Sequence, residues 1–193
     1  MILRICLAAA LSVLALESWA QPANRFQRSR YRQESLAPYV PSPQVVVEKM
    51  VEAAHLKAGE TLFDLGCGDG RIPITAAREF KIKGICVELM PDLVAEARAN
   101  VLHERLDDRI EVVQANMLDV DLRPADVVTL YLLTSSNETL RPILEKSLRP
   151  GARVISHDFQ MQGWKANKVE SVRASGRDHS IYVYVMPPKK NDK

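Results

Sequence analysis

A run of closely spaced glycines behind an aspartate is the segment of the sequence with the clearest chemistry. Residues 64–70 read Asp-Leu-Gly-Cys-Gly-Asp-Gly and connect an apolar run to a helical pattern. The alternating Gly66, Gly68 and Gly70 let the backbone turn sharply and approach a ligand, because a Cβ would clash there. A nicotinamide dinucleotide site would need a glycine where this chain has Arg71. The spacing therefore argues against a pyrophosphate-binding turn.

The aspartate indicates which ligand the turn suits. Asp64 stands near the end of the apolar run, where a carboxylate can organise the turn and the polar end of a methionine moiety. Backbone N–H groups of the loop would face the negative part of that moiety. S-adenosylmethionine (SAM) presents an ammonium, a carboxylate and a sulfonium, and it carries no phosphate. We therefore expect SAM as the cofactor, and the alternative is a glycine-rich turn without a ligand. The residues expected to hold SAM are Asp64, Gly66, Cys67, Gly68 and Gly70.

Two later segments supply further contacts to the same ligand. Glu88 follows the next apolar run, about twenty residues beyond the glycines, where a carboxylate can accept hydrogen bonds from both ribose hydroxyls. Asn116 could accept a hydrogen bond from the adenine amino group, and Met117 could pack on the ring. An aspartate is more usual than an asparagine at this point, and an ordinary turn is the alternative there.

Elements that alternate along the chain must position these residues. We expect strands at 61–65, 84–87, 110–114, 126–132 and 153–156. Helices are expected at 43–54, 72–80, 92–105 and 137–148. The first helix should begin with Ser42 as the N-cap and Pro43 in the first helical position. Alternation of apolar strands with helices predicts a parallel sheet that is covered on both faces.

The end of the chain departs from this alternation. Strands at 168–173 and 180–186 are separated by 174–178, which is long enough for a hairpin and too short for a crossover helix. The predicted fold class is therefore α/β. It is a Rossmann-like three-layer α-β-α sandwich whose seven-stranded, mostly parallel sheet has an antiparallel last strand.

The N-terminal segment precedes the folded domain. Residues 1–20 combine Arg4, an uncharged apolar run at 5–16 and small residues before Gln21, which is typical of a signal peptide. We expect an exported, periplasmic protein, or one associated with a membrane through an uncleaved anchor at 5–16. Export would separate the protein from SAM, which is made in the cytosol. The remaining segments are a flexible leader at 21–38, a domain at 39–187 and a tail at 188–193.

Charge and cysteine content limit the other possibilities. The formal net charge of +2 gives no reason to expect DNA as a partner. Cys67 and Cys86 fall at adjacent predicted strands, and we interpret them as two buried thiols. A bridge between them is the less favoured alternative, because Cys67 lies in a tight cofactor turn.

The motifs resemble a known family. Asp64 to Gly70 together with Glu88 is similar to the class I SAM-dependent methyltransferases. Tyr39-Val40-Pro41-Ser42-Pro43 and Asp69-Gly70-Arg71-Ile72 resemble the small protein-lysine methyltransferases that modify the ATP synthase c subunit, as does the segment 151–156. The resemblance implies N-methylation of a protein lysine, with Ser42 helping to cover the methionine end of SAM. Small-molecule or RNA methylation, or an exported binding module without catalysis, are the alternatives.

The methyl acceptor should approach over the strand ends. The N-P-P-Y type motif of adenine and glutamine methyltransferases is replaced here by residues 131–134, Tyr-Leu-Leu-Thr. Tyr131 could line the acceptor channel, and His157 with Asp158 could position or deprotonate an amine. A structural histidine is the alternative. Phe159 and Trp164 could form a channel wall, although core packing is favoured for both, and no metal is expected.

Overall fold

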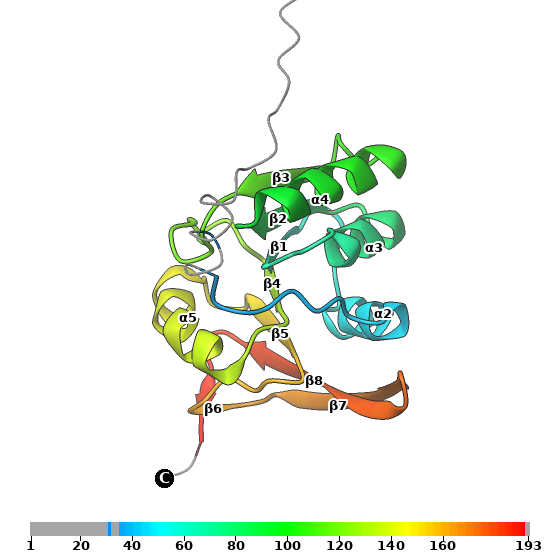
Figure 1. Cartoon of the computed structure of the whole chain (residues 1–193). Helices are drawn as coiled ribbons and strands as arrows, with labels where there is room; N and C mark the ends of the chain where they lie inside the picture. The colour runs from blue at the N-terminus through cyan, green and yellow to red at the C-terminus, as the bar shows by residue number, and fades with distance from the viewer. Residues whose placement is uncertain (1–30, 32–34, 192–193) are drawn as a thin grey trace, which may run out of the picture.

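The computed structural model describes Tyr31 and residues 35–191, and a seven-stranded sheet forms the centre of this part (Figure 1). The spatial order is β3-β2-β1-β4-β5-β8-β7. The strands are β1 (Thr61–Leu65), β2 (Lys83–Glu88), β3 (Ile110–Gln114), β4 (Val127–Leu130), β5 (Arg153–His157), β7 (Lys168–Ala174) and β8 (Arg177–Val185). The order reverses direction between β1 and β4, and ligands of such sheets bind at this switch point, beyond the carboxyl ends of the strands.

The last two strands of the sheet confirm the expected change of direction. Strands β1 to β5 pair in parallel, whereas β8 pairs antiparallel with both β5 and β7. The hairpin turn is only Ser175-Gly176, shorter than the predicted 174–178. Both residues have positive φ, at 49° and 83°, as a two-residue hairpin turn of the primed type requires.

Helices cover both faces of the sheet, as predicted (Figure 1). They are α2 (Gln44–Ala53), α3 (Arg71–Glu79), α4 (Pro91–His103) and α5 (Thr134–Ser147). The first three lie on one face and α5 on the other. Alternation along β1 supplies both cores, since Leu62 packs with α2 and α3 while Phe63 and Leu65 pack with α5.

The start of helix α2 differs from the prediction. Helix α2 begins at Gln44 because Pro43 is extended, with φ −55° and ψ 144°, and no side chain caps the helix. Ser42 was expected as the N-cap, but its Oγ lies 3.0 Å from His157 Nδ1 instead. The hydroxyl therefore joins the helix start to the end of β5.

Two segments near the ends of the described chain also contact the domain. Lys189–Lys190 of the expected tail form β9, which pairs antiparallel with β6 (Trp164–Lys165). At the other end, Ser136 donates a hydrogen bond to the Leu36 carbonyl, and Ala37 packs on the core beneath α5. The predicted signal peptide or anchor, residues 1–20, lies outside the described residues, and none of the described helices is long and apolar enough to cross a bilayer.

Candidate active site

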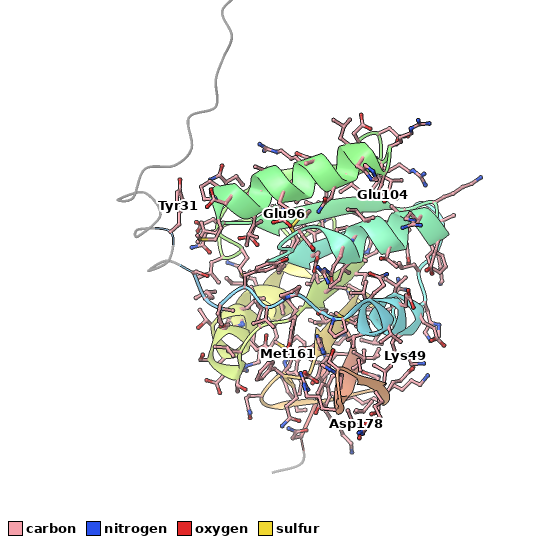
Figure 2. All side chains as sticks on the ribbon, turned by 45° about the vertical axis from the view of Figure 1, so that its right-hand side comes forward. Tyr31, Lys49, Glu96, Glu104, Met161 and Asp178 are labelled. Atoms are coloured by element: carbon pink, nitrogen blue, oxygen red, sulfur yellow. A yellow bond between two sulfur atoms is a disulfide. The ribbon has the colours of Figure 1, made fainter. Side chains whose placement is uncertain are left out.

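A cavity of about 770 Å³ opens at the carboxyl ends of the central strands. Its walls are the loops after β1, β2, β3 and β4, together with residues 35–42. In Figure 1 this N-terminal segment runs from beside α5 across the strand ends to α2, and in Figure 2 it arrives at the helix that carries Lys49. The segment therefore covers one side of the cavity, and we call residues 35–42 the strap.

The glycine loop after β1 has the backbone conformation that its sequence predicts. Gly66, Gly68 and Gly70 have φ of 78°, 57° and 81°, in the left-handed region. At Gly68 a Cβ would collide with the ring of Tyr39, which belongs to the strap. The Gly66 and Cys67 N–H groups both donate to the Val87 carbonyl, at 2.9 and 3.1 Å. The loop is thus hydrogen-bonded to β2 on one side and contacted by the Tyr39 ring on the other.

Asp64 lies at the floor of the cavity with one oxygen atom that lacks a partner. Thr129 Oγ1 donates to Asp64 Oδ1 at 2.7 Å, while Oδ2 is buried and makes no hydrogen bond. Burial raises the pKa of the Asp64 carboxyl to about 7, and the charges of Glu88 and Asp69 add to the effect. A buried carboxylate oxygen that faces a cavity needs a hydrogen-bond donor, and a cationic donor is the strongest partner for it. The ammonium of SAM fits this requirement, whereas a pyrophosphate would be repelled.

Glu88 holds the glycine loop as well as lining the cavity. Its Oε2 accepts a hydrogen bond from Gly68 N at 3.0 Å, and Oε1 accepts from Leu89 N and Met90 N at 2.8 Å each. A carboxylate has about four lone-pair sites, and these bonds use both sites of Oε1 and one of Oε2, so capacity for one ribose hydroxyl remains on Oε2. The ribose contact stays a prediction, and the structural role of Glu88 is an addition to it.

Asn116 and Met117 line the cavity in the turn after β3. The Asn116 Oδ1 atom accepts a hydrogen bond from Leu118 N at 3.0 Å. This bond uses the oxygen that we expected to meet the adenine amino group. The predicted base contact would therefore share that atom, and it stays a prediction together with the packing of Met117.

An ion pair that the motif analysis did not assign supports the strap. Arg71 Nε donates to Asp69 Oδ1 at 2.9 Å, and Arg71 Nη1 donates to the Ser42 carbonyl at 2.7 Å. The Arg71 guanidinium holds the pKa of Asp69 below its usual range against the effect of burial. Tyr39 lies close to both partners: burial and the charge of Asp69 raise the pKa of its phenol, and Arg71 lowers it. The sequence signal was the local Asp-Gly-Arg spacing, but its link to Tyr39 exists only in the fold.

Tyr131, which directly follows β4, lines the cavity, and its role toward the methyl acceptor stays a prediction. The His157 ring stacks on it, with 3.8 Å between the ring centroids. His157 itself is fully buried and does not line the cavity. Burial lowers the pKa of its imidazole to about 4, so the ring is neutral at physiological pH. His157 therefore lies behind Tyr131, where it could influence an acceptor only through that ring.

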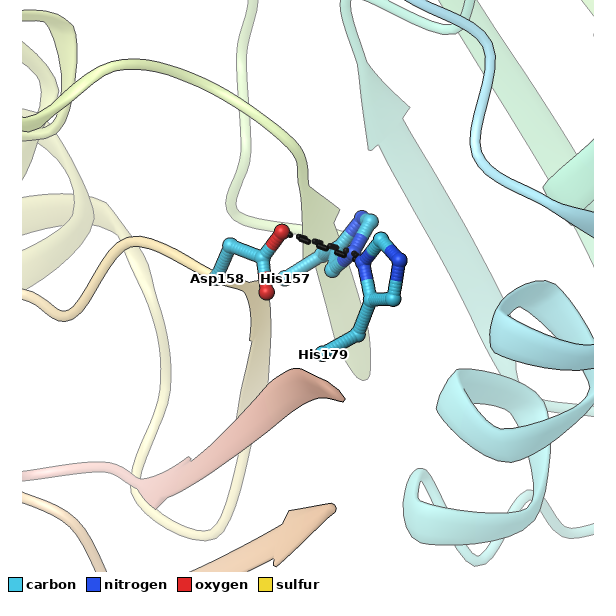
Figure 3. Close-up of side chains that lie close together, drawn as sticks. All are labelled: His157, Asp158 and His179. Atoms are coloured by element: carbon cyan, nitrogen blue, oxygen red, sulfur yellow. Dashed lines mark hydrogen bonds and ion pairs between the residues drawn. The ribbon is translucent and has the colours of Figure 1, made fainter. Parts of the chain in front are cut away.

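A second histidine, which sequence reasoning missed, completes this region (Figure 3). His157 Nε2 lies 2.8 Å from His179 Nδ1, and Asp158 Oδ2 lies 3.2 and 3.1 Å from these two atoms. Two imidazoles and a carboxylate are also metal ligands. Here, however, Arg177 Nη2 donates to the same Asp158 Oδ2 at 2.6 Å, so this oxygen already has a cationic partner. We interpret the cluster as a hydrogen-bond network.

The two aromatic side chains after β5 have different environments. Trp164 is buried in the core, and its Nε1 donates to Glu145 Oε1 at 2.7 Å. Core packing, the favoured interpretation, describes Trp164 correctly. Phe159 lies near Tyr131, with 6.3 Å between ring centroids, but it does not line the cavity either.

The two cysteines form a disulfide, so the preferred interpretation as free thiols is wrong. Cys67 and Cys86 are bonded, with 5.3 Å between their Cα atoms. We expected the tight turn around Cys67 to disfavour a bridge. In the fold the loop folds back on β2, as the bonds to the Val87 carbonyl show, and this brings the two side chains together. The covalent link fixes the glycine loop to the neighbouring strand.

The fold and the site together define a SAM-dependent methyltransferase of the Rossmann-like class. Residues 64–168 match the family model described as the ANTKMT methyltransferase domain, and the chain belongs to this family. The predicted resemblance to small protein-lysine methyltransferases is thereby confirmed.

Individual relatives cover most of the chain. A protein-lysine N-methyltransferase of Saccharolobus islandicus is 44% identical over 79% of this chain and 96% of its own length. The adenine nucleotide translocase lysine N-methyltransferase of Mus musculus is 32% identical over 85% of this chain and 71% of its own. A solved RNA methyltransferase from Salinibacter ruber, in complex with S-adenosyl-L-homocysteine, has a TM-score of 0.73 and 41% identity, covering 80% of this chain and 98% of its own.

Proposed function

We propose that this methyltransferase transfers the methyl group of SAM to a lysine amine of a protein. The names of the relatives from Saccharolobus islandicus and Mus musculus support a protein lysine as the acceptor. They also favour an enzyme over the alternative of a binding module without catalysis.

The charge of the cavity wall carries the proposal. Four carboxylates line the cavity: Asp64, Asp69, Glu88 and Asp92. Arg71 is the one cation among the lining residues, and it is paired with Asp69. Opposite charges attract strongly at short range where water is partly excluded. Asp64 and Glu88 are assigned to SAM and Asp69 is paired with Arg71, so the wall does not provide a direct partner for lysine, but its net negative charge favours the approach of a cationic side chain over that of RNA phosphates.

The residues of the chain divide the work of the reaction between them. When bound, SAM supplies a methyl group on a sulfonium, which an amine can attack directly. Asp64 would hold the ammonium end, Glu88 the ribose, and the strap would exclude water from one side of the cavity. Tyr131 would orient the amine, so catalysis rests mainly on proximity and orientation. Because His157 lies outside the cavity and burial lowers its pKa to about 4, which makes it a weak base, the amine would give its proton to water.

Labelling of a lysate tests the proposal. Purified enzyme is incubated with a same-species lysate and SAM that carries a radioactive methyl group, and Asp64→Asn serves as the control that should bind SAM poorly. We expect label in protein, released as methyl-lysine on complete hydrolysis. Label in protein that hydrolyses to another methylated residue, or label confined to a small-molecule fraction, would overturn the lysine assignment.

RNA methylation is the second candidate, because the Salinibacter ruber protein of 41% identity is described as an RNA methyltransferase. The lysate experiment separates the two candidates if each sample is divided and treated with ribonuclease or with protease. Label that is lost with ribonuclease alone would favour RNA as the acceptor.

We also propose that the N-terminal segment exports or anchors the protein. The apolar run at 5–16 is the sequence basis. The disulfide between Cys67 and Cys86 supports the idea, since such bonds persist mainly in oxidising compartments. Fractionation of cells that express the full chain, with mass analysis of its N-terminus, tests it. A full-length protein in the cytosolic fraction, with both thiols reduced, would contradict it.

A further inference from the structure

Tyr131 is held on two sides, although it lies at the wall of a cavity. The face of its ring stacks on the His157 imidazole at 3.8 Å between centroids. Burial raises the pKa of its phenol, and the nearby Arg177 guanidinium, on β8 of the hairpin, opposes this through its charge and through hydrogen bonding. A guanidinium can only donate, so in this contact the phenol oxygen is the acceptor, and its second lone pair stays available to an N–H group of the methyl acceptor.

Both supports of Tyr131 meet at one carboxylate. Asp158 Oδ2 accepts from Arg177 Nη2 at 2.6 Å and lies 3.1 Å from His179 Nδ1. His179 Nδ1 in turn lies 2.8 Å from His157 Nε2, as Figure 3 shows for the three side chains. The other oxygen of Asp158 accepts from Ser180 N at 3.0 Å, which fixes the carboxylate to β8.

The protons of this network can be placed consistently. The remaining nitrogen of His157, Nδ1, lies 3.0 Å from Ser42 Oγ. If His157 carries its proton there, His179 Nδ1–H can donate to both Asp158 Oδ2 and His157 Nε2. This arrangement leaves His179 Nε2, which is buried without a partner, as a bare acceptor. Every other polar atom of the network then has a partner, as buried polar groups require.

We propose that Arg177 and His179 are positioning residues for methyl transfer, which act through Asp158 and His157 to fix the orientation of Tyr131 at the acceptor end of the cavity. The proposal rests on methyl transfer in this cavity and does not depend on which acceptor is used. A phenol that is free to rotate would present its hydroxyl to the acceptor only part of the time. Loss of the network should therefore lower kcat and leave SAM binding intact.

Arg177 is the best position for the test because its side chain is 53% exposed, so a substitution there should leave the fold intact. Arg177→Gln removes the ion pair with Asp158 and the guanidinium beside the Tyr131 hydroxyl. Arg173→Gln is the matched control, since Arg173 lies on the same hairpin, is 70% exposed and pairs with Asp178 away from the cavity. Arg177→Lys keeps the charge and should restore part of the rate, because a single ammonium cannot bridge both partners as well as a guanidinium.

A double-mutant cycle with Tyr131→Phe distinguishes positioning from a general structural effect. Methyl transfer is measured with the lysate fraction that became labelled in the lysate experiment, used as the methyl acceptor. We expect Arg177→Gln and Tyr131→Phe each to lower kcat about fivefold, the value of one lost hydrogen bond. The SAM dissociation constant should change less than twofold. The double variant should be no slower than Tyr131→Phe alone, because the bond that Arg177 makes is already gone. Additive losses, or equal rates for Arg177→Gln and Arg173→Gln, would overturn the proposal.

A second readout needs no acceptor at all. In protein labelled with ¹³C-tyrosine, the Tyr131 resonance is identified by its loss in Tyr131→Phe. Arg177→Gln and His179→Gln should both shift or broaden it, whereas Arg173→Gln and His103→Gln, at an 83% exposed histidine, should not. An unchanged Tyr131 signal in Arg177→Gln would sink the proposal even if no acceptor were found. Failure of the lysine assignment alone would leave both readouts as expected.

Discussion

At both ends of the cavity a tyrosine lies beside an aspartate–arginine pair, but the two pairs come from different parts of the chain. At the cofactor end, Tyr39 lies beside the pair of Asp69, in the glycine loop, and Arg71, the first residue of α3. At the acceptor end, Tyr131 lies beside Arg177 of β8, which is paired with Asp158 just after β5. Both tyrosines line the cavity.

The difference between the ends lies in how far apart their parts are in the sequence. The cofactor end is built almost entirely from a short loop, the ends of β1 and β2, and the strap. The acceptor end needs β4, β5 and β8, which are brought together by the sheet. A local site can be recognised as a motif, whereas a dispersed site acquires its chemistry only when the strands pair. Four experiments test this difference between a local cofactor end and a dispersed acceptor end.

The disulfide should have the largest effect, and it should act on the cofactor end. It closes a loop with a sequence separation of 19, so its loss should lower the free energy of unfolding by about 3 kcal/mol. Urea unfolding of the wild type with and without reductant measures this change. The Cys67→Ser, Cys86→Ser double variant should match the reduced wild type and ignore reductant. Equal unfolding curves for oxidised and reduced wild type would show that the bond contributes nothing.

Asp64→Asn should weaken SAM binding about fiftyfold, because a charged hydrogen bond to the ammonium becomes a neutral one. Calorimetry near neutral pH measures the dissociation constant. Asp119→Asn, at an exposed position after β3, is the control and should bind as the wild type does. Unchanged SAM affinity in Asp64→Asn would remove the main support for the cofactor end as described here.

The pH dependence of SAM binding should follow Asp64. Its pKa of about 7 means that the carboxyl is mostly neutral at pH 6 and mostly ionised at pH 7.5. SAM affinity should therefore rise about eightfold over this range, and Asp64→Asn should lack the rise. The stability of the ligand-free protein should show the opposite sign. Between pH 4 and 7 the unfolded state ionises this group while the folded state does not, so the contribution of Asp64 to stability falls as pH increases.

Ser42→Ala should have the smallest effect, and it tests the connection between the two ends. The Ser42 carbonyl accepts from Arg71 of the cofactor end, while its hydroxyl meets His157 of the acceptor end. Only the second contact is lost, so the free energy of unfolding should fall by about 1 kcal/mol. Urea unfolding gives this value, with Ser135→Ala at an exposed position of α5 as the control. If Ser42→Ala were as stable as that control, the hydroxyl would not couple the strap to β5.

Most of the fold could be predicted from the sequence. The alternation of apolar strands and amphipathic helices defined the order of the elements, and residues 174–178 were too short for a crossover, which defined the antiparallel end. The errors occurred at boundaries and at contacts between distant segments. Ser42 has the right chemistry for an N-cap, but the extended Pro43 delays the helix and His157 takes the hydroxyl. Cys67 and Cys86 become partners only because the glycine loop folds back on β2.

By itself, the sequence determined the glycine loop of the cofactor end, but not its disulfide or its contact with Tyr39. Glycines in the left-handed region of φ and a carboxylate at the end of a strand are needed within one short stretch of backbone. They can therefore be recognised in residues 64–70 alone. The tertiary structure alone decided that His157 lies behind Tyr131 and that His179 and Arg177 belong to the same network. The physical reason is that hydrogen bonds and ring stacking act over a few ångströms, and residues far apart in the chain come within that range only after the sheet has formed.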